Sequence, residues 1–454
     1  MSEHAVAGPP DPPDAKHMRS VAVVDVRGRR SEERLSRWVL AAVVTVMFGV
    51  VVRAAGLAVD LPAHLSFARE LSSTGQTALP YYLFQQATVV VRALIPFGML
   101  GHLHGDWAEP DATWNIAGIV TMTIFLVVLA ELIYARLLTV TSSLRQRDRY
   151  LVCGSLTLTA MLVAPISILT WNDQQMYFGY VSTNVFHNPT SIVAKPFALL
   201  LLWVIADRIF ATAKSSPRTL AAVALLSVMS LHAKPNFTLC LLPAVGLMAL
   251  WGQRRRETVN WWLVVGGFGL PSVAYLGYQY LGFSDVEGGV ALAPFRMVRE
   301  FADRHDTSTW LLLPMLGMSL VFPLVMLALF RREIGRSPSS ILAWLTTAVG
   351  IGMFYLLAET GPRAHDGNFA WSAQISLFVL FFECIRLLFT EYGTVARAAR
   401  AASGSEDRHV STVAWVRFAL TERRVQIATA ALALHLLCGI WFYAQEIILP
   451  TAWW

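Results

Sequence analysis

The stretch WVLAAVVTVMFGVVVRAAGL at residues 38–57 contains a single charged side chain, Arg53. A helix of about 20 apolar residues is long enough to cross a hydrocarbon layer roughly 30 Å thick. Runs of this kind recur almost to the C-terminus, and the whole chain is 55% hydrophobic and only 15% charged. Because soluble domains carry about 25% charged residues, this composition predicts an all-α, polytopic membrane protein.

We predict about eleven membrane-spanning helices from these runs. The predicted spans are residues 38–57, 114–138, 150–171, 192–211, 219–233, 235–251, 260–283, 310–330, 341–359, 369–389 and 425–449. Residues 1–37 are polar and rich in Pro and Arg, which predicts a disordered cytoplasmic tail before one transmembrane domain at 38–454. This tail has no short apolar core with a small-residue cleavage site, so we expect the first helix to be retained.

The basic residues predict the orientation of the chain. The apolar stretch 82–103 is excluded from the spans, because its crossing would place the three Arg residues of SSLRQRDRY outside. We expect it to lie in the membrane interface, within a long first external loop at 58–113 that contains membrane-lying helices. With this topology 27 of the 36 Lys and Arg residues are cytoplasmic. The N-terminus is then inside and the C-terminus outside.

Composition also limits the possible partners. The net charge of +6 does not indicate nucleic acid, because the basic residues lie in short loops between apolar runs. The four cysteines are scattered singly, which predicts neither a disulfide framework nor a zinc site. Asp106, Glu109 and Asp111 offer oxygen ligands, but they have no EF-hand or DxD spacing. The sequence therefore does not indicate a metal.

Nine basic residues remain on the predicted external side, where the orientation bias does not account for them. They are Arg53, Arg69, Arg92, Lys195, Lys234, Arg296, Arg299, Arg304 and Arg363. A cation inside the membrane costs about 2.5–3.5 kcal/mol unless it has a partner or a water-filled cavity. Lys195 in HNPTSIVAKP and Lys234 in LHAKPNF each precede a proline, which disfavours helical geometry at the lysine and frees backbone groups for a ligand. The alternative is that both side chains extend along apolar surface to the interface.

Four predicted external segments contain most of the polar residues. They are VDLPAHLSFARE (59–70), TWNDQQMYFGYVSTNVFHNPT (170–190), FSDVEGGVALAPFRMVREFADRHD (283–306) and AETGPRAHDGNFAW (358–371). Since all four lie on one side of the membrane, we expect them to converge on one site. The candidate substrate-binding residues are His64, His187, Asn188, Lys195, Lys234, Arg363 and Asp366.

Asp60 is the candidate catalytic residue. Burial beside a membrane raises the pKa of a carboxyl group and suits it to proton abstraction, whereas a neighbouring imidazole or Arg acts in the opposite direction. Asp60 and His64 are four residues apart and share a face if this turn is helical. The alternative is that Asp60 only caps a helix that begins at LPAH, because Asp is a favoured N-cap residue. An interfacial His such as His64 or His187 often has a purely structural hydrogen bond.

This arrangement resembles the GT-C superfamily of membrane glycosyltransferases. Its members have a cytoplasmic N-terminus, about 8 to 13 spans, a long first external loop with membrane-lying helices, and an acidic residue just after the first span. Asp60 in VDLPAH matches the position of that acid, and LHAKPNF followed by LLPAV resembles a KP element of some members. Many members have an adjacent second acid, whereas this chain has Leu61 and Ala63. The departure favours a single base without a metal.

The resemblance implies the inverting transfer of a hexosyl or pentosyl group from a polyprenyl-phosphate carrier to a glycan, lipid or protein acceptor. The active site would lie outside the cytoplasm at a plasma (inner) membrane and need no cofactor. Lys195, Lys234 and Arg363 would hold the donor phosphate, and aromatic residues such as Trp371 would stack on sugar. One alternative is a transporter or lipid-carrier flippase, which repeats and mid-span ionisable residues would favour. Another is a membrane acyltransferase with His64 or His187 as base.

Overall fold

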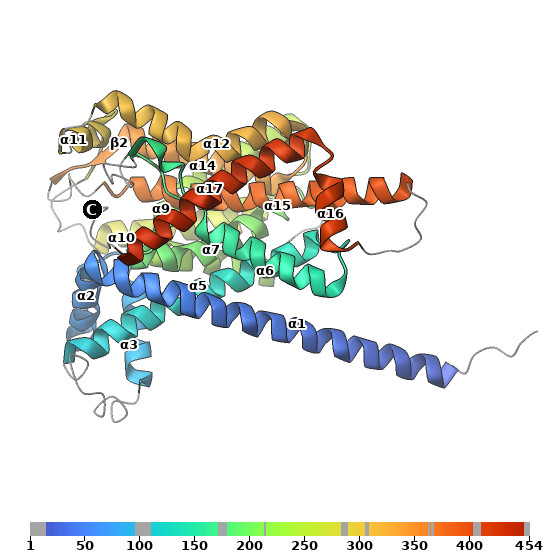
Figure 1. Ribbon diagram of the computed structural model, residues 1–454. Helices are drawn as coiled ribbons and strands as arrows, with labels where there is room; N and C mark the ends of the chain where they lie inside the picture. Colours follow the sequence, from blue (N-terminus) through green and yellow to red (C-terminus); the bar gives the residue numbers. More distant parts are fainter. Residues whose placement is uncertain are drawn as a thin grey trace, which may run out of the picture.

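The computed structural model describes residues 15–95, 110–170, 179–212, 215–282, 289–304, 308–361, 364, 367–402 and 410–448. These ranges are mostly helical and contain very little strand, which confirms the all-α class (Figure 1). Their strands form one small antiparallel sheet, in which β1 (Val290–Leu292) pairs with β2 (Leu357–Glu359) and Val290 lies opposite Glu359.

Eight helices of the described chain are long and apolar enough to cross a membrane, which indicates an integral membrane protein. They are α1 (Ala15–Val51) with its π-helical continuation η1 (Val52–Gly56), α5 (Pro110–Val140), α7 (Pro189–Ala206), α9 (Asn236–Arg254), α12 (Leu312–Leu329), α14 (Pro338–Leu356), α15 (Ala370–Ala402) and α17 (Arg423–Ile448). The other three predicted spans coincide with shorter elements: α6 (Gln146–Leu162), α8 (Pro217–Ala233), and η3 (Trp262–Gly269) followed by α10 (Leu270–Gly282). The total of eleven spans stays a prediction.

Short elements complete the described chain: α2 (Leu61–Thr74), α3 (Leu83–Leu94), η2 (Ser167–Thr170), α11 (Arg296–Arg304), η4 (Thr309–Leu311), α13 (Arg331–Gly335) and α16 (Thr412–Ala419). Figure 1 shows α2 and α3 running across the direction of α1 and α5 at one end of the bundle. At 12 residues, α3 is about 18 Å long, too short to cross the membrane. Residues 96–109 lie outside the described ranges, so the exclusion of 82–103 from the spans stays a prediction.

The hydrophobic core surrounds α15. Nearly every residue of this helix from Ala370 to Leu388 is buried, as expected for a helix that its neighbours surround on all sides. Its residues Phe378, Phe381 and Phe382 are almost fully buried. The helices that contact it include α14, α9, α7, α5 and α17. At Gly350 of α14 an added Cβ would lie 2.6 Å from the backbone oxygen of Ser372, so glycine is required for this close approach.

The first helix begins earlier than the sequence predicts. α1 begins at Ala15, within the segment 1–37 that the sequence predicts as a tail, while residues 1–14 lie outside the described ranges. The charged turn before the first apolar run is held by Arg37, which pairs with Glu33 at 3.0 Å and with Glu131 of α5 at 2.9 Å. These ion pairs stabilise the helical turn next to the first apolar run.

The predicted cytoplasmic loops gather at the end of the bundle away from α2 and α3. Leu144 forms a parallel bridge with Val410, and Arg424 pairs with Glu333 at 2.8 Å, so loops far apart in sequence lie together. Figure 1 places α16 at this same end. The basic loops therefore share one end, as the charge pattern predicts, and the assignment of that end to the cytoplasm stays a prediction.

Candidate functional site

Lys234 lies at the break between α8 and α9. α8 ends at Ala233, α9 begins at Asn236, and Lys234 is extended, with φ −168° and ψ 122°. Pro235 accounts for this geometry, because the residue before a proline is disfavoured in helical conformation and proline is tolerated where a helix begins. The prediction that this KP pair interrupts the helix is confirmed.

The ammonium group of Lys234 is buried in a polar and aromatic environment. Its Nζ donates to Thr190 Oγ1 at 2.9 Å and to Asn188 Oδ1 at 3.4 Å, and it lies 4.7 Å from the ring centre of Trp371 and 5.6 Å from that of Tyr81. These hydrogen-bond partners are neutral. Burial lowers the pKa of Lys234 to about 7, although Asp60 and Glu359 act in the opposite direction. An anionic ligand would therefore find a desolvated cation here.

Asp60 faces the same site from the junction of η1 and α2. Its carboxylate makes no capping bond to α2; instead Oδ2 accepts a hydrogen bond from Asn188 Nδ2 at 2.8 Å, and His187 Nε2 lies 3.7 Å away. The side chain is 33% exposed, so solutes can reach it. Burial raises the pKa of Asp60, while the Asn188 bond and the charge of Lys234 act to lower it. The structure therefore does not support the alternative that Asp60 only caps α2.

Asn188 connects Asp60 to Lys234. It is the N-cap of α7, where its Oδ1 accepts from Ser191 N at 2.9 Å and from Thr190 Oγ1 at 3.0 Å. Because Oδ1 is engaged by the helix terminus and by Lys234, the Nδ2 group must point toward Asp60. The N-cap of α7 thus fixes Asp60 and Lys234 on opposite sides of one amide.

The two histidines of the site are neutral at pH 7. Burial and the charge of Lys234 lower the pKa of His64 to about 3 and that of His187 to well below its usual range. His64 Nδ1 lies 2.9 Å from Gln85 Nε2 of α3, and because the amide nitrogen can only donate, Nδ1 accepts. The His187 ring lies 5.7 Å from that of Trp371. Such weakly basic rings suit positioning better than general-base catalysis.

A second carboxylate borders the site. Glu359, the last residue of β2, accepts from Asn368 Nδ2 at 2.8 Å. Asn236, directly after the KP pair, donates to Asn368 O at 2.8 Å and to Ser372 Oγ at 2.9 Å, which ties the β2 segment to α9 and α15. Since β1 pairs with β2, the described parts of the four polar segments lie at this end of the molecule.

Lys195 has different surroundings. It lies inside α7, which continues without a break through Pro196, so the prediction of non-helical geometry at this KP pair is wrong. Its Nζ donates to Thr183 O at 3.1 Å and to Asn184 Oδ1 at 3.3 Å, and lies 4.6 Å from the Phe378 ring. These contacts tie the 183–184 segment to α7, which favours a structural role.

Two candidate residues, Arg363 and Asp366, lie outside the described residues. Three residues that we did not single out belong to the site: Gln85, Thr190 and Asn236. Thr190 directly follows HNP and Asn236 directly follows KP, so these two motifs could have pointed to both residues. Gln85 had none, because it is a single amide in an apolar stretch that meets His64 only through the packing of α3 on α2.

The fold and this site define a helical integral membrane protein with a polar cluster at one end of its bundle. Among the residues described, no group of three or more His, Cys, Asp or Glu side chains is placed to hold a metal ion. Comparisons with known protein families, curated proteins and solved structures found no match to this chain.

Proposed function

We propose that this protein is a membrane glycosyltransferase similar to the GT-C superfamily, which moves a sugar from a polyprenyl-phosphate carrier to an extracytoplasmic acceptor. The observation that carries the proposal is the pairing of Asp60 with Lys234 across the amide of Asn188. A reachable carboxylate and a buried ammonium group thereby face one site next to the first-loop helices α2 and α3.

In the proposed reaction, Asp60 accepts the proton of the acceptor hydroxyl as its oxygen forms a bond to the anomeric carbon. The bond from that carbon to the phosphate oxygen breaks, and polyprenyl phosphate leaves with the electron pair. Direct displacement inverts the anomeric configuration. General-base assistance commonly contributes about 10²- to 10⁴-fold in rate, and Lys234 stabilises the negative charge that develops on the leaving phosphate.

The walls of the site fit such a donor. The Trp371 and Tyr81 rings beside Lys234 offer apolar faces against which a sugar can stack. A phosphate close to Lys234 opposes the effect of burial and restores the charge of the ammonium group. The carrier's prenyl chain would approach through the membrane beside α2 and α3, which lie across the bundle (Figure 1).

A transporter or flippase would use ionisable groups along the spanning helices. Among the described residues, three such buried groups are held by partners of their own. Lys195 donates to Thr183 O, Glu383 pairs with Arg386 at 2.8 Å, and His435 contacts Ala164 O at 2.7 Å. These contacts give the three groups structural roles rather than a place on a transport path. This favours an enzyme with its site at one end of the bundle.

The purified full-length protein tests the proposal with a panel of polyprenyl-phosphate-linked hexoses and pentoses. We expect one donor to release polyprenyl phosphate in an acceptor-dependent reaction, and the same lipid-linked sugar to co-purify with the protein in mass spectra. If folded protein releases polyprenyl phosphate from none of the donors, the proposal fails. Movement of intact labelled donor across vesicles would instead support the flippase.

The proposed orientation has a separate test. Gln76, in the loop between α2 and α3, and Ser142, near the Leu144–Val410 bridge, are both exposed and lie at opposite ends of the bundle. A cysteine at Gln76 should react with an impermeant thiol reagent in intact cells, and one at Ser142 only after permeabilisation. The reverse pattern would place the site in the cytoplasm.

A further inference from the structure

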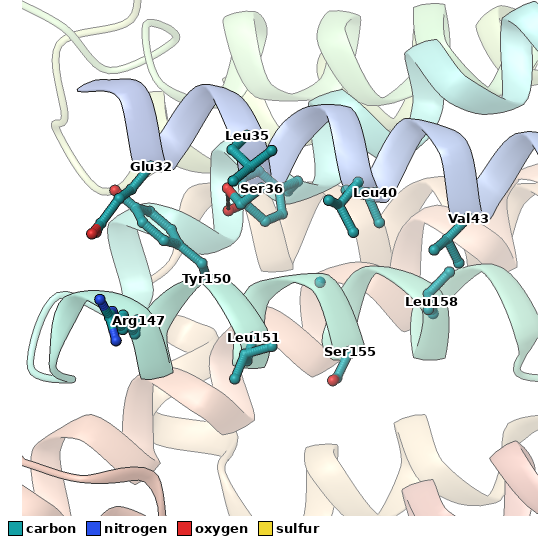
Figure 2. Close-up of a pocket in the computed structure, with 13 residues that line it drawn as sticks. Glu32, Leu35, Ser36, Leu40, Val43, Arg147, Tyr150, Leu151, Ser155 and Leu158 are labelled. Carbon is teal, nitrogen blue, oxygen red and sulfur yellow. Dashed lines mark hydrogen bonds between the residues drawn. The ribbon is translucent and has the colours of Figure 1, made fainter. Parts of the chain in front are cut away.

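A groove separates α1 from α6 at the end of the bundle opposite Asp60 and Lys234. It has a volume of about 530 Å³ and is shown in Figure 2, where the two helices run side by side as its walls. The α1 wall extends from Glu32 to Val43 and the α6 wall from Arg147 to Leu158. Each wall has a charged residue at the same end, and most of the remaining lining is apolar.

The dimensions of the groove match one leaflet of a bilayer. Val43 follows Glu32 by eleven helical steps, and Leu158 follows Arg147 by the same number, so both walls are about 16 Å long. Half of a hydrocarbon core of roughly 30 Å is nearly the same length. Leu35, Val39 and Leu151 are 64%, 55% and 72% exposed, which leaves the groove open to the hydrocarbon around the protein.

The mouth of the groove contains one charge of each sign. Glu32 and Arg147 project from different helices (Figure 2), and the described structure contains no ion pair between them. The Tyr150 hydroxyl lies on the same stretch of lining. Arg binds a phosphate through two parallel hydrogen bonds, and a carboxylate binds a primary ammonium group. The mouth is thus complementary to a headgroup that contains both.

We propose that this groove binds a zwitterionic phospholipid with a primary ammonium headgroup, with the phosphate at Arg147, the ammonium at Glu32 and one acyl chain between α1 and α6. Glu32 disfavours an anionic headgroup that has no ammonium. A quaternary ammonium has no N–H to donate to the carboxylate. The site is at the opposite end of the bundle from the donor site, so the inference does not rest on the proposed glycosyltransferase activity.

The test uses delipidated full-length protein, equilibrated with equal amounts of phosphatidylethanolamine, phosphatidylcholine and phosphatidylglycerol of identical acyl chains. Lipid retained after purification is quantified by mass spectrometry. We expect enrichment of phosphatidylethanolamine, and a loss of about fivefold in Arg147→Gln, the effect of one basic contact at a membrane surface. Glu32→Gln should lose the preference over phosphatidylglycerol. Arg145→Gln, which removes an exposed arginine outside the groove lining, is the matched control and should behave as wild type.

A second variant tests the apolar part of the groove without disturbing the fold. Gly154 lines the groove, and a Cβ added there meets no atom within 4 Å. Gly154→Leu should therefore fill the groove and abolish lipid retention, whereas Gly317→Leu, which also adds a side chain in open space on α12, should not. Equal retention of the three lipids by wild type would overturn the proposal. Enrichment that survives both Arg147→Gln and Gly154→Leu would overturn it as well.

Discussion

The tripeptide Ala-Lys-Pro occurs twice, at 194–196 and at 233–235, with opposite structural outcomes. At Lys195 the helix α7 continues through the proline, whereas at Lys234 the chain is extended and one helix gives way to another. α7 is the more buried setting, with 83% of its spanning window inside the protein. Packing on all sides can hold a helix together through a proline, so the local sequence does not decide the break.

The two lysines also differ in what remains available to a ligand. The ammonium of Lys195 binds a backbone carbonyl and an amide of the 183–184 segment, which fixes that segment to α7. The ammonium of Lys234 binds Thr190 and Asn188 and is electrostatically coupled to Asp60. A buried cation beside a reachable carboxylate can engage a ligand of its own. We therefore expect the two positions to respond differently to the same substitution.

Among the substitutions, that of Asp60 is expected to lower the rate of sugar transfer most. Asp60 lies in the site of Lys234, and among the described residues Lys195 has no such carboxylate beside it. Asp60→Asn keeps the size of the side chain but removes the base, so sugar transfer should fall about 10²- to 10⁴-fold. Thermal unfolding and donor binding should stay near wild type. Asp207→Asn, at the exposed partner of Arg136, is the control and should keep full activity. Near-normal transfer by Asp60→Asn would remove Asp60 from the mechanism and make Glu359 or Asp366 the next candidate.

The next effect distinguishes the two lysines directly. Lys234→Gln removes a charged donor to phosphate, a contact that is worth about 1.5–3 kcal/mol, or roughly 10- to 150-fold in donor affinity. Acceptor affinity should change much less. Titration of a fluorescent donor analogue against the purified variant measures the change. An unaltered donor affinity would mean that Lys234, like Lys195, serves only the fold.

A pH titration sharpens the same comparison. Because burial lowers the pKa of Lys234 to about 7, raising the pH above 7 removes the charge that attracts the phosphate. Donor affinity should therefore fall with rising pH, by up to about tenfold per pH unit. Lys234→Arg keeps its charge at every accessible pH and should bind with a flat profile. An equally steep profile in Lys234→Arg would assign the titration to another group.

The smallest effect on function is expected at Lys195. Lys195→Gln should leave donor affinity unchanged but lower the free energy of unfolding by about 1–3 kcal/mol, because Thr183 O and Asn184 Oδ1 lose a buried donor. Thermal unfolding in detergent, measured beside donor titration, separates the two properties. A large loss of donor affinity with normal stability would return Lys195 to the phosphate site, as the sequence predicts.

Much of the site could be predicted from the sequence, because its residues lie in short polar segments at the ends of apolar runs. Asp60, Asn188 and Lys234 were all candidates, and the structure places Asn188 within hydrogen-bonding distance of both of the others. Gln85 was missed, because its relation to His64 depends on how α3 packs on α2. Arg363 and Asp366 stay predictions, since they lie outside the described residues.

The sequence by itself determined the helical class, the positions of the apolar helices and the separation of basic loops from the polar cluster. Each of these depends on local composition and on the cost of placing charge in a membrane. Only the tertiary structure decided which Ala-Lys-Pro breaks a helix, whether Asp60 caps α2 or faces Lys234, and that α1 and α6 form a groove. Those outcomes depend on contacts between residues far apart in the chain, and such contacts leave no local pattern to recognise.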